Sequence, residues 1–148
     1  MRIYVGNRAY PGTVGMHIQA RPPAWLAEMG SVPILKPSGG MTQMMARLVA
    51  DRKAGLPVDP VLFQGYRVAY WEHLRDAFEA GKLAPGRMVD ARGAVVPPDV
   101  TLICTCSREE ARAGRCHRAW LVPWLDRAGW EEVFCDWLGT VDTGGTVG

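Results

Sequence analysis

The sequence contains no apolar run of the roughly 18 residues that a membrane-spanning helix needs. It also lacks a strong charge imbalance, because 17 Lys and Arg face 15 Asp and Glu for a formal net charge of +2. A dedicated duplex-binding protein is usually far more basic. There is no internal repeat or low-complexity stretch, and the chain reaches Asn7 and Arg8 too early for a secretory leader. These absences predict a soluble cytoplasmic protein with no membrane partner.

Enough apolar sequence is present for one hydrophobic core. The chain has 148 residues, of which 48% are hydrophobic and 22% charged, and this balance is typical of a globular domain. We expect a single domain over residues 1–138. Residues 139–148, which include Gly144 and Gly145, are expected to form a flexible C-terminal tail.

Carboxylates are scarce near the N-terminus. Residues 1–50 hold five basic side chains and a single acid, Glu28, whereas residues 51–148 hold twelve basic and fourteen acidic side chains. The N-terminal part is therefore suited to form one wall of an anion site.

All four cysteines, Cys104, Cys106, Cys116 and Cys135, lie in the last third of the chain. Without an export signal a disulfide framework is not expected, which leaves metal binding, redox chemistry or plain burial. Cys106, Cys116 and His117 could meet at a metal, but Cys-x-Cys followed ten residues later by Cys-His matches no standard zinc spacing. The sequence therefore predicts neither a metal nor another cofactor.

Hydrophobic periodicity and turn residues divide the chain into alternating strands and helices. The expected strands are residues 2–6, 14–20, 32–35, 100–106 and 131–137, and the expected helices are 24–29, 42–53, 61–82 and 117–128. This order predicts a single Rossmann-like α/β domain in three layers with a largely parallel sheet. Ligands of such folds lie beyond the carboxyl ends of the strands. That rule predicts that a ligand binds at the loop after Gly6 and at the polar loop after Cys106.

The loop before the last helix carries most of the available chemistry. It leads into a helix N-terminus, whose free amides and dipole favour an anion. Gly114 allows the backbone to approach a ligand, and Arg115 and Arg118 supply charged hydrogen-bond donors. The thiolate of Cys116 would be favoured there, and His117 can donate a hydrogen bond or act as an acid or base.

Polar side chains also follow the other expected strands. Asn7 and Arg8 come directly after the first strand, while Arg21 and Lys36 lie near the ends of two others. In a parallel sheet all four can converge with Arg115 and Arg118 on one edge. The alternative is that they are ordinary surface charges.

One pattern resembles the phosphate loop of cysteine phosphatases. Cys106 and Arg112 have the Cys-x5-Arg spacing of that loop. The residues between them are Ser-Arg-Glu-Glu-Ala, and their two carboxylates would repel a phosphate. The spacing therefore does not predict a phosphatase.

The C-terminal third resembles the family known as domain of unknown function 488. In that family a Leu-Leu-Cys strand leads through an acidic loop into Cys-His-Arg and a helix; here the corresponding segments are 102–104, Glu109-Glu110 and 116–118. Shorter similarities to its compact phage and bacterial members are an early strand, the Pro-x-x-Trp segment at 22–25, Leu-x-Pro at 35–37, and a tyrosine on the long helix, either Tyr66 or Tyr70. The resemblance implies a Rossmann-like fold with a polar pocket around Cys-His-Arg. It implies no particular reaction, although it is compatible with nucleotide or nucleic-acid contexts.

Three functions remain open from the sequence. The first is binding of a phosphate-bearing small molecule or nucleic acid, with Gly114, Arg115 and Arg118 facing Asn7 and Arg8. The second is an enzyme of phosphoryl or glycosyl transfer or hydrolysis in the same pocket, with His117 as acid/base or Cys116 as nucleophile. The third is a structural or partner-binding module with buried cysteines, in which the tryptophans of the helices pack in the core or against a second copy of the chain.

Overall fold

The computed structural model, which describes residues 2–137 and 139–142, is built around a six-stranded sheet. Its strands are β1 (Arg2–Gly6), β2 (Val14–His17), β3 (Gly30–Ser31), β4 (Val100–Ile103), β5 (Glu132–Cys135) and β6 (Gly139–Asp142). The helices are α1 (Ala24–Ala27), α2 (Gly40–Lys53), α3 (Pro60–Glu79), α4 (Arg108–Arg112) and α5 (His117–Arg127), with a 3₁₀ turn at Pro33–Leu35. The chain thus forms the single Rossmann-like α/β domain that the alternation of elements predicts.

The strands lie in the order β3-β2-β4-β1-β5-β6, and the first five of these run parallel. Within the sheet, β1 lies between β4 and β5, with Gly6 level with Ile103 and Val5 level with Cys135. Only β6 is antiparallel among the described strands. Because parallel strands end at the same edge, the segments that follow β1, β4 and β5 meet there.

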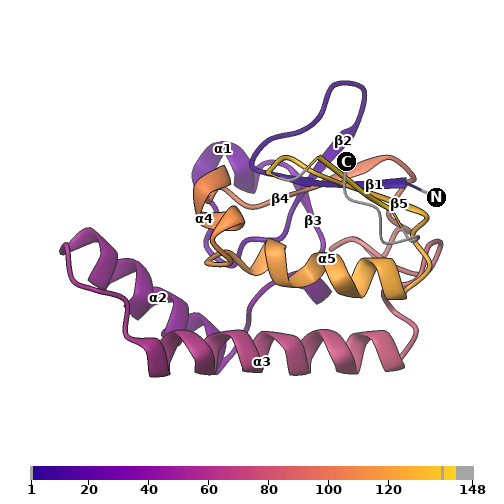
Figure 1. The fold of residues 1–148 in the computed structure, drawn as a ribbon. Helices are drawn as coiled ribbons and strands as arrows, with labels where there is room; N and C mark the ends of the chain where they lie inside the picture. Colours follow the sequence, from indigo (N-terminus) through magenta and orange to yellow (C-terminus); the bar gives the residue numbers. More distant parts are fainter. Residues whose placement is uncertain (1, 138, 143–148) are drawn as a thin grey trace.

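One face of the sheet packs on α5. Side chains alternate along β1, so that Ile3 and Val5 are fully buried toward the helices while Tyr4 on the other face is only half-buried. Helix α3 packs in turn on the outer side of α5 (Figure 1) through edge-to-face contacts of Phe63 and Tyr66 with Trp120. The core therefore lies between the sheet and this helical layer.

The opposite face of the sheet is covered by the β1–β2 loop and by α1. Tyr10 of that loop packs on Tyr4, and the hydroxyls of Thr13 and Thr101 lie 2.6 Å apart in a hydrogen bond. With the sheet between this cover and the helices, the domain has three layers. Helix α2 extends away from the body, and the chain then returns through α3 beneath α5 (Figure 1).

Several parts of the chain differ from the sequence-based prediction. The strands expected at 14–20 and 100–106 end at His17 and Ile103. Residues 32–35 were expected to be a strand, but Pro33 begins a 3₁₀ turn and the strand pairing is confined to Gly30–Ser31. Part of the polar loop after Cys106 is helical, because Ser107 caps α4 by accepting a hydrogen bond from the Glu110 amide at 3.1 Å. Residues 139–142, which we placed in the tail, pair with β5 as β6, while 143–148 lie outside the described residues.

Among the described residues, none of the helices has both the length and the apolar character needed to cross a membrane.

Candidate functional site

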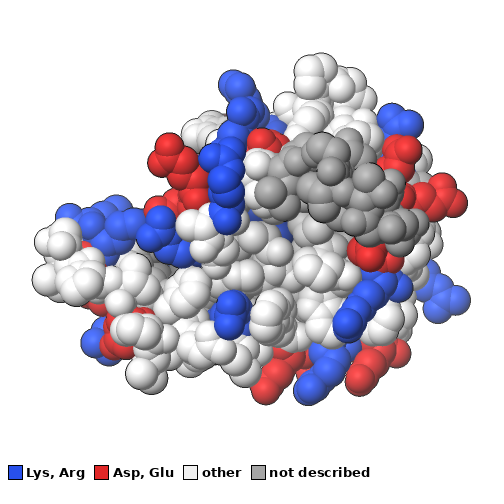
Figure 2. Space-filling model, in the orientation of Figure 1, with Lys and Arg blue, Asp and Glu red and all other residues white. Residues whose placement is uncertain are grey.

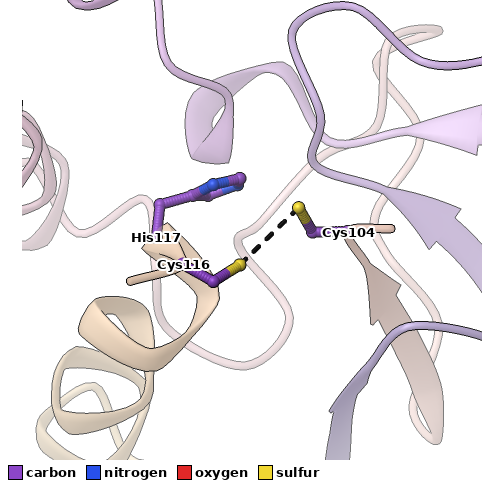
Figure 3. A group of neighbouring side chains, drawn as sticks. All are labelled: Cys104, Cys116 and His117. Atoms are coloured by element: carbon purple, nitrogen blue, oxygen red, sulfur yellow. Dashed lines mark hydrogen bonds between the residues drawn. The ribbon is translucent and has the colours of Figure 1, made fainter. Parts of the chain in front are cut away.

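Three cysteines and a histidine come together where β4 ends and α5 begins. Cys104 follows the last residue of β4, and Cys116 and His117 are the N-cap and first residue of α5 (Figure 3). The Cys104 sulfur lies 3.7 Å from that of Cys116 and 3.8 Å from that of Cys106. All are free thiols. Residues twelve positions apart are thus brought into contact by the fold.

Helix α4 explains how this contact forms. It turns the chain back on itself after Cys106, and Gly114 ends the turn with a φ of +74°. The Arg115 amide donates to the Glu110 carbonyl at 2.8 Å, and the Trp120 indole donates to the Gly114 carbonyl at 2.9 Å. Gly114 therefore serves to reverse the chain, a different role from the ligand approach we expected.

His117 is buried and paired with the protein's own backbone. Its side chain is 4% exposed, and its Nε2 lies 3.1 Å from the Ile18 carbonyl oxygen. The ring also meets Tyr70 edge to face. Burial lowers the pKa of His117 to about 4, although the charge of Cys106 and the bond to Ile18 oppose that shift.

Arg118 does not face a cleft, which corrects its expected role as a ligand-binding residue. Its side chain is 0% exposed, and the two Nη atoms donate to the carbonyls of Cys104 and Ser107, each at 3.1 Å. Nη2 also lies 3.7 Å from Asp136 Oδ1, and the guanidinium packs over the Trp137 ring. All of its described partners are internal, so Arg118 holds the ends of β4 and β5 against α5.

A pocket of about 960 Å³ lies beside the cysteines. Its apolar wall comes mainly from α2 and the start of α3, and Cys104, Cys106, Cys116 and His117 form part of its floor. The basic side chains that line it are Arg21, Arg52, Lys53 and Arg115. Figure 2 shows basic side chains gathered between the α2 arm and the body of the molecule, beside a smaller acidic group.

Glu110 is the carboxylate that lines this pocket within the described residues. It bridges two of the basic residues, with Arg52 at 3.2 Å and Arg115 at 3.3 Å. The two guanidinium groups are about half-exposed and are held near each other by this bridge. The pocket therefore keeps a positive balance and has two arginines in a defined position.

The Tyr66 hydroxyl is an unusual polar group in this pocket. Tyr66 is 4% exposed, and its hydroxyl has no hydrogen-bond partner among the described residues. Burial raises the pKa of this phenol well above its ordinary value. Because a buried unpaired hydroxyl is costly, Tyr66 is a polar group whose hydrogen-bonding capacity the described residues leave unused.

The three clustered thiols differ in acidity. Hydrogen bonds from the thiols of Cys104 and Cys116 lower the pKa of Cys106, with help from the charges of His117 and Arg52. Contact with Cys106 raises the pKa of Cys104, and burial raises that of Cys116. The negative charge of the cluster is thus favoured on Cys106. This disagrees with the expectation that Cys116 is the reactive thiolate.

Asn7 and Arg8 lie in a second, smaller pocket of about 350 Å³ with Arg108 and Asp136. The Asn7 amide donates to Asp136 Oδ2 at 3.0 Å. We expected the two loops to form a single pocket, but each of them lines a pocket of its own. Lys36 lines neither pocket.

The structure joins Arg115, Cys116 and His117 of the predicted site with residues that the sequence did not single out. The sequence places Arg52 and Lys53 at the end of a helix, and Tyr66 on the apolar face of the long helix, where Tyr66 or Tyr70 corresponds to a helical tyrosine of the family that the chain resembles. The sequence signal for Arg52 and Lys53 is a basic pair in the last turn of a helix.

No protein-family model, curated protein or solved structure matches this chain.

Proposed function

We propose that the protein binds a phosphate-bearing ligand, nucleotide-like or derived from nucleic acid, in the pocket beside the cysteines. The observation that carries the proposal is the set of four basic side chains against one carboxylate around a deep, partly apolar space. Small-molecule sites are typically apolar clefts of about 300–1,000 Å³ with a few polar groups that orient the ligand. A pocket of about 960 Å³ accommodates a nucleotide.

The positions of the polar groups support a division of roles. Arg52 and Arg115, linked through Glu110, present guanidinium groups that can bind phosphate oxygens in a bidentate manner. Tyr66, deeper in the pocket, offers an unpaired hydroxyl to a polar group of the ligand. Phe63 and Leu48 on the wall offer apolar surface to a base or a sugar.

The proposal is limited to binding. The enzyme alternative assigned acid/base chemistry to His117 and nucleophilic chemistry to Cys116, and both side chains are buried. Burial keeps the Cys116 thiol protonated by raising its pKa, which disfavours it as a nucleophile.

Two expectations from the sequence stay predictions. One is the resemblance to the domain of unknown function 488 family, and the other is a second copy of the chain as a partner. We place the protein in the cytoplasm because a reducing compartment suits thiols that lie 3.7 Å apart and would otherwise oxidise.

Isothermal titration with inorganic phosphate, ADP and a short single-stranded oligonucleotide tests the proposed function. We expect binding that Arg52→Ala weakens about tenfold, as loss of a charge-assisted hydrogen bond would. Arg92→Ala, in an exposed turn, is the matched control and should change nothing. Tyr66→Phe should weaken binding without loss of stability, because it removes an unpaired hydroxyl. Absence of binding by all three probes, or an equal effect of Arg52→Ala and Arg92→Ala, would contradict the proposal.

A further inference from the structure

We propose that Cys104, Cys106, Cys116 and His117 together bind one zinc ion. The sulfur atoms have the spacing of zinc ligands. A tetrahedral zinc with Zn–S bonds of about 2.3 Å holds its sulfur ligands about 3.8 Å apart. The Cys104 sulfur lies 3.7 Å from Cys116 and 3.8 Å from Cys106, whereas a disulfide requires about 2.05 Å.

His117 lies within reach of the same ion. The ligand atoms of Cys104, Cys116 and His117 all lie within 4.8 Å of one another (Figure 3). A metal-binding histidine usually donates its other ring N–H to a carbonyl or carboxylate, which sets the tautomer. His117 has this arrangement, because Nε2 lies 3.1 Å from the Ile18 carbonyl oxygen and must carry the proton to bond it. Nδ1 is then the unprotonated nitrogen.

The ligand set selects the metal. Two thiols and one imidazole have their ligand atoms within 4.8 Å of one another, and Cys106 adds a third thiol 3.8 Å from the Cys104 sulfur. These are soft or intermediate donors, and none of them is a carboxylate, which would favour magnesium or calcium. A tetrahedral set of sulfur and nitrogen ligands is typical of structural zinc. With four ligands from the protein the site is closed, so the ion stabilises the fold at the floor of the pocket.

The elements that carry the ligands are held rigidly. Arg118 donates to the carbonyls of Cys104 and Ser107, which brackets the segment that contains Cys106. Cys116 and His117 begin α5, and that helix packs on the sheet. Three thiolates and Zn²⁺ carry one net negative charge, and the Arg118 guanidinium, which also pairs with Asp136, lies beside the cluster through its hydrogen bond to the Cys104 carbonyl.

This inference differs from the sequence-based expectation of no metal. That expectation rested on spacing alone, since Cys-x-Cys followed by Cys-His after ten residues is not a standard motif. Helix α4, which the sequence did not predict, closes the intervening loop and returns Cys116 to Cys104. The metal ligands and the side chains proposed to bind the anion are different residues, although both sets line the same pocket.

Metal analysis of the full chain tests the proposal. The protein is purified under reducing conditions, incubated with zinc and desalted, and its zinc content is measured by mass spectrometry. We expect about one zinc per chain, and less than about a tenth of that in Cys116→Ser. Cys135→Ser, which alters a buried cysteine outside the cluster, is the matched control and should keep its zinc. Zinc-free wild-type protein, or equal loss of zinc in the two variants, would overturn the proposal.

A second measurement uses the unaltered protein, because loss of a structural metal can itself unfold a variant. Cobalt titrated into the reduced wild-type chain should produce sulfur-to-cobalt charge-transfer absorption and the strong visible bands of tetrahedral cobalt. Zinc added afterwards should remove these bands. Weak bands typical of six-coordinate cobalt would overturn the proposal. Arg52→Ala should retain the full cobalt spectrum, so failure of the anion proposal and failure of the metal proposal remain distinguishable.

Discussion

The guanidinium of Arg118 and the carboxylate of Asp136 lie 3.7 Å apart inside the domain, with side-chain exposures of 0% and 6%. Arg118 belongs to the first turn of α5, and Asp136 directly follows β5. Asp136 also accepts a hydrogen bond from the Asn7 amide at the end of β1. One buried ion pair therefore links α5 with the carboxyl ends of two parallel strands.

Replacement of Arg118 should reduce stability strongly. In Arg118→Met, Asp136 loses its buried cation and keeps only the half-exposed Arg108, and the carbonyls of Cys104 and Ser107 each lose a donor. Removal of one partner of a buried pair typically costs about 3–5 kcal/mol. We expect a decrease of that size in the free energy of unfolding, measured by urea denaturation. Arg108→Met is the control, since Arg108 is half-exposed at 3.6 Å from Asp136 and should contribute under about 1 kcal/mol. Equal effects of the two variants would show that Arg118 is not structural.

A side chain at Gly15 should also destabilise the fold. Gly15 lies in β2, and a Cβ there would come within 2.9 Å of Ile103 Cδ1 and 3.3 Å of Met29 Sδ. Because Ile103 is fully buried, Gly15→Ala should cost about 1–3 kcal/mol through overpacking. Gly40→Ala is the control, since a Cβ at the start of α2 meets nothing within 4 Å. Thermal unfolding should therefore show a lower midpoint for Gly15→Ala and an equal or higher one for Gly40→Ala; the reverse order would refute the packing argument.

The buried ring of His17 should make stability depend on pH. Burial, together with the positive charge of Lys36, lowers the pKa of His17 below its ordinary value of 6.5. As the pH falls through 6.5, the unfolded chain takes up a proton that the folded ring resists, and the folded state loses stability. We expect the free energy of unfolding to decrease between about pH 7.5 and 5.5, and to decrease less in His17→Gln. Identical pH profiles of the two proteins would show that His17 is not responsible.

Much of the fold could be predicted from local patterns. Residues 2–6 form β1 with the expected bounds, because alternation and β-branched residues act over a few neighbouring positions. The long α3 is confirmed for the same reason, with Asp59 as its N-cap accepting hydrogen bonds from the Val61 and Leu62 amides. The prediction of a strand at 32–35 was wrong because Pro33 favours a 3₁₀ turn over continued pairing.

The candidate site was predicted only in part. Its helix N-terminus and the residues Arg115, Cys116 and His117 are in the pocket lining, but Arg118 points into the protein and Asn7 and Arg8 lie in the second pocket. The side on which a residue of the first helical turn emerges depends on how α5 packs on the sheet. That packing is a long-range property, so motif spacing alone does not reveal it.

By itself the sequence determined the alternation of strands and helices, and with it the α/β class, because backbone propensity and side-chain periodicity are local. Only the tertiary structure decided that Cys104 meets Cys116, that Arg52 of α2 faces Arg115, and that Arg118 is enclosed. These contacts depend on the parallel crossovers and on the return of the chain through α4. Both are set by burial of the whole core, to which residues distant in the sequence contribute together.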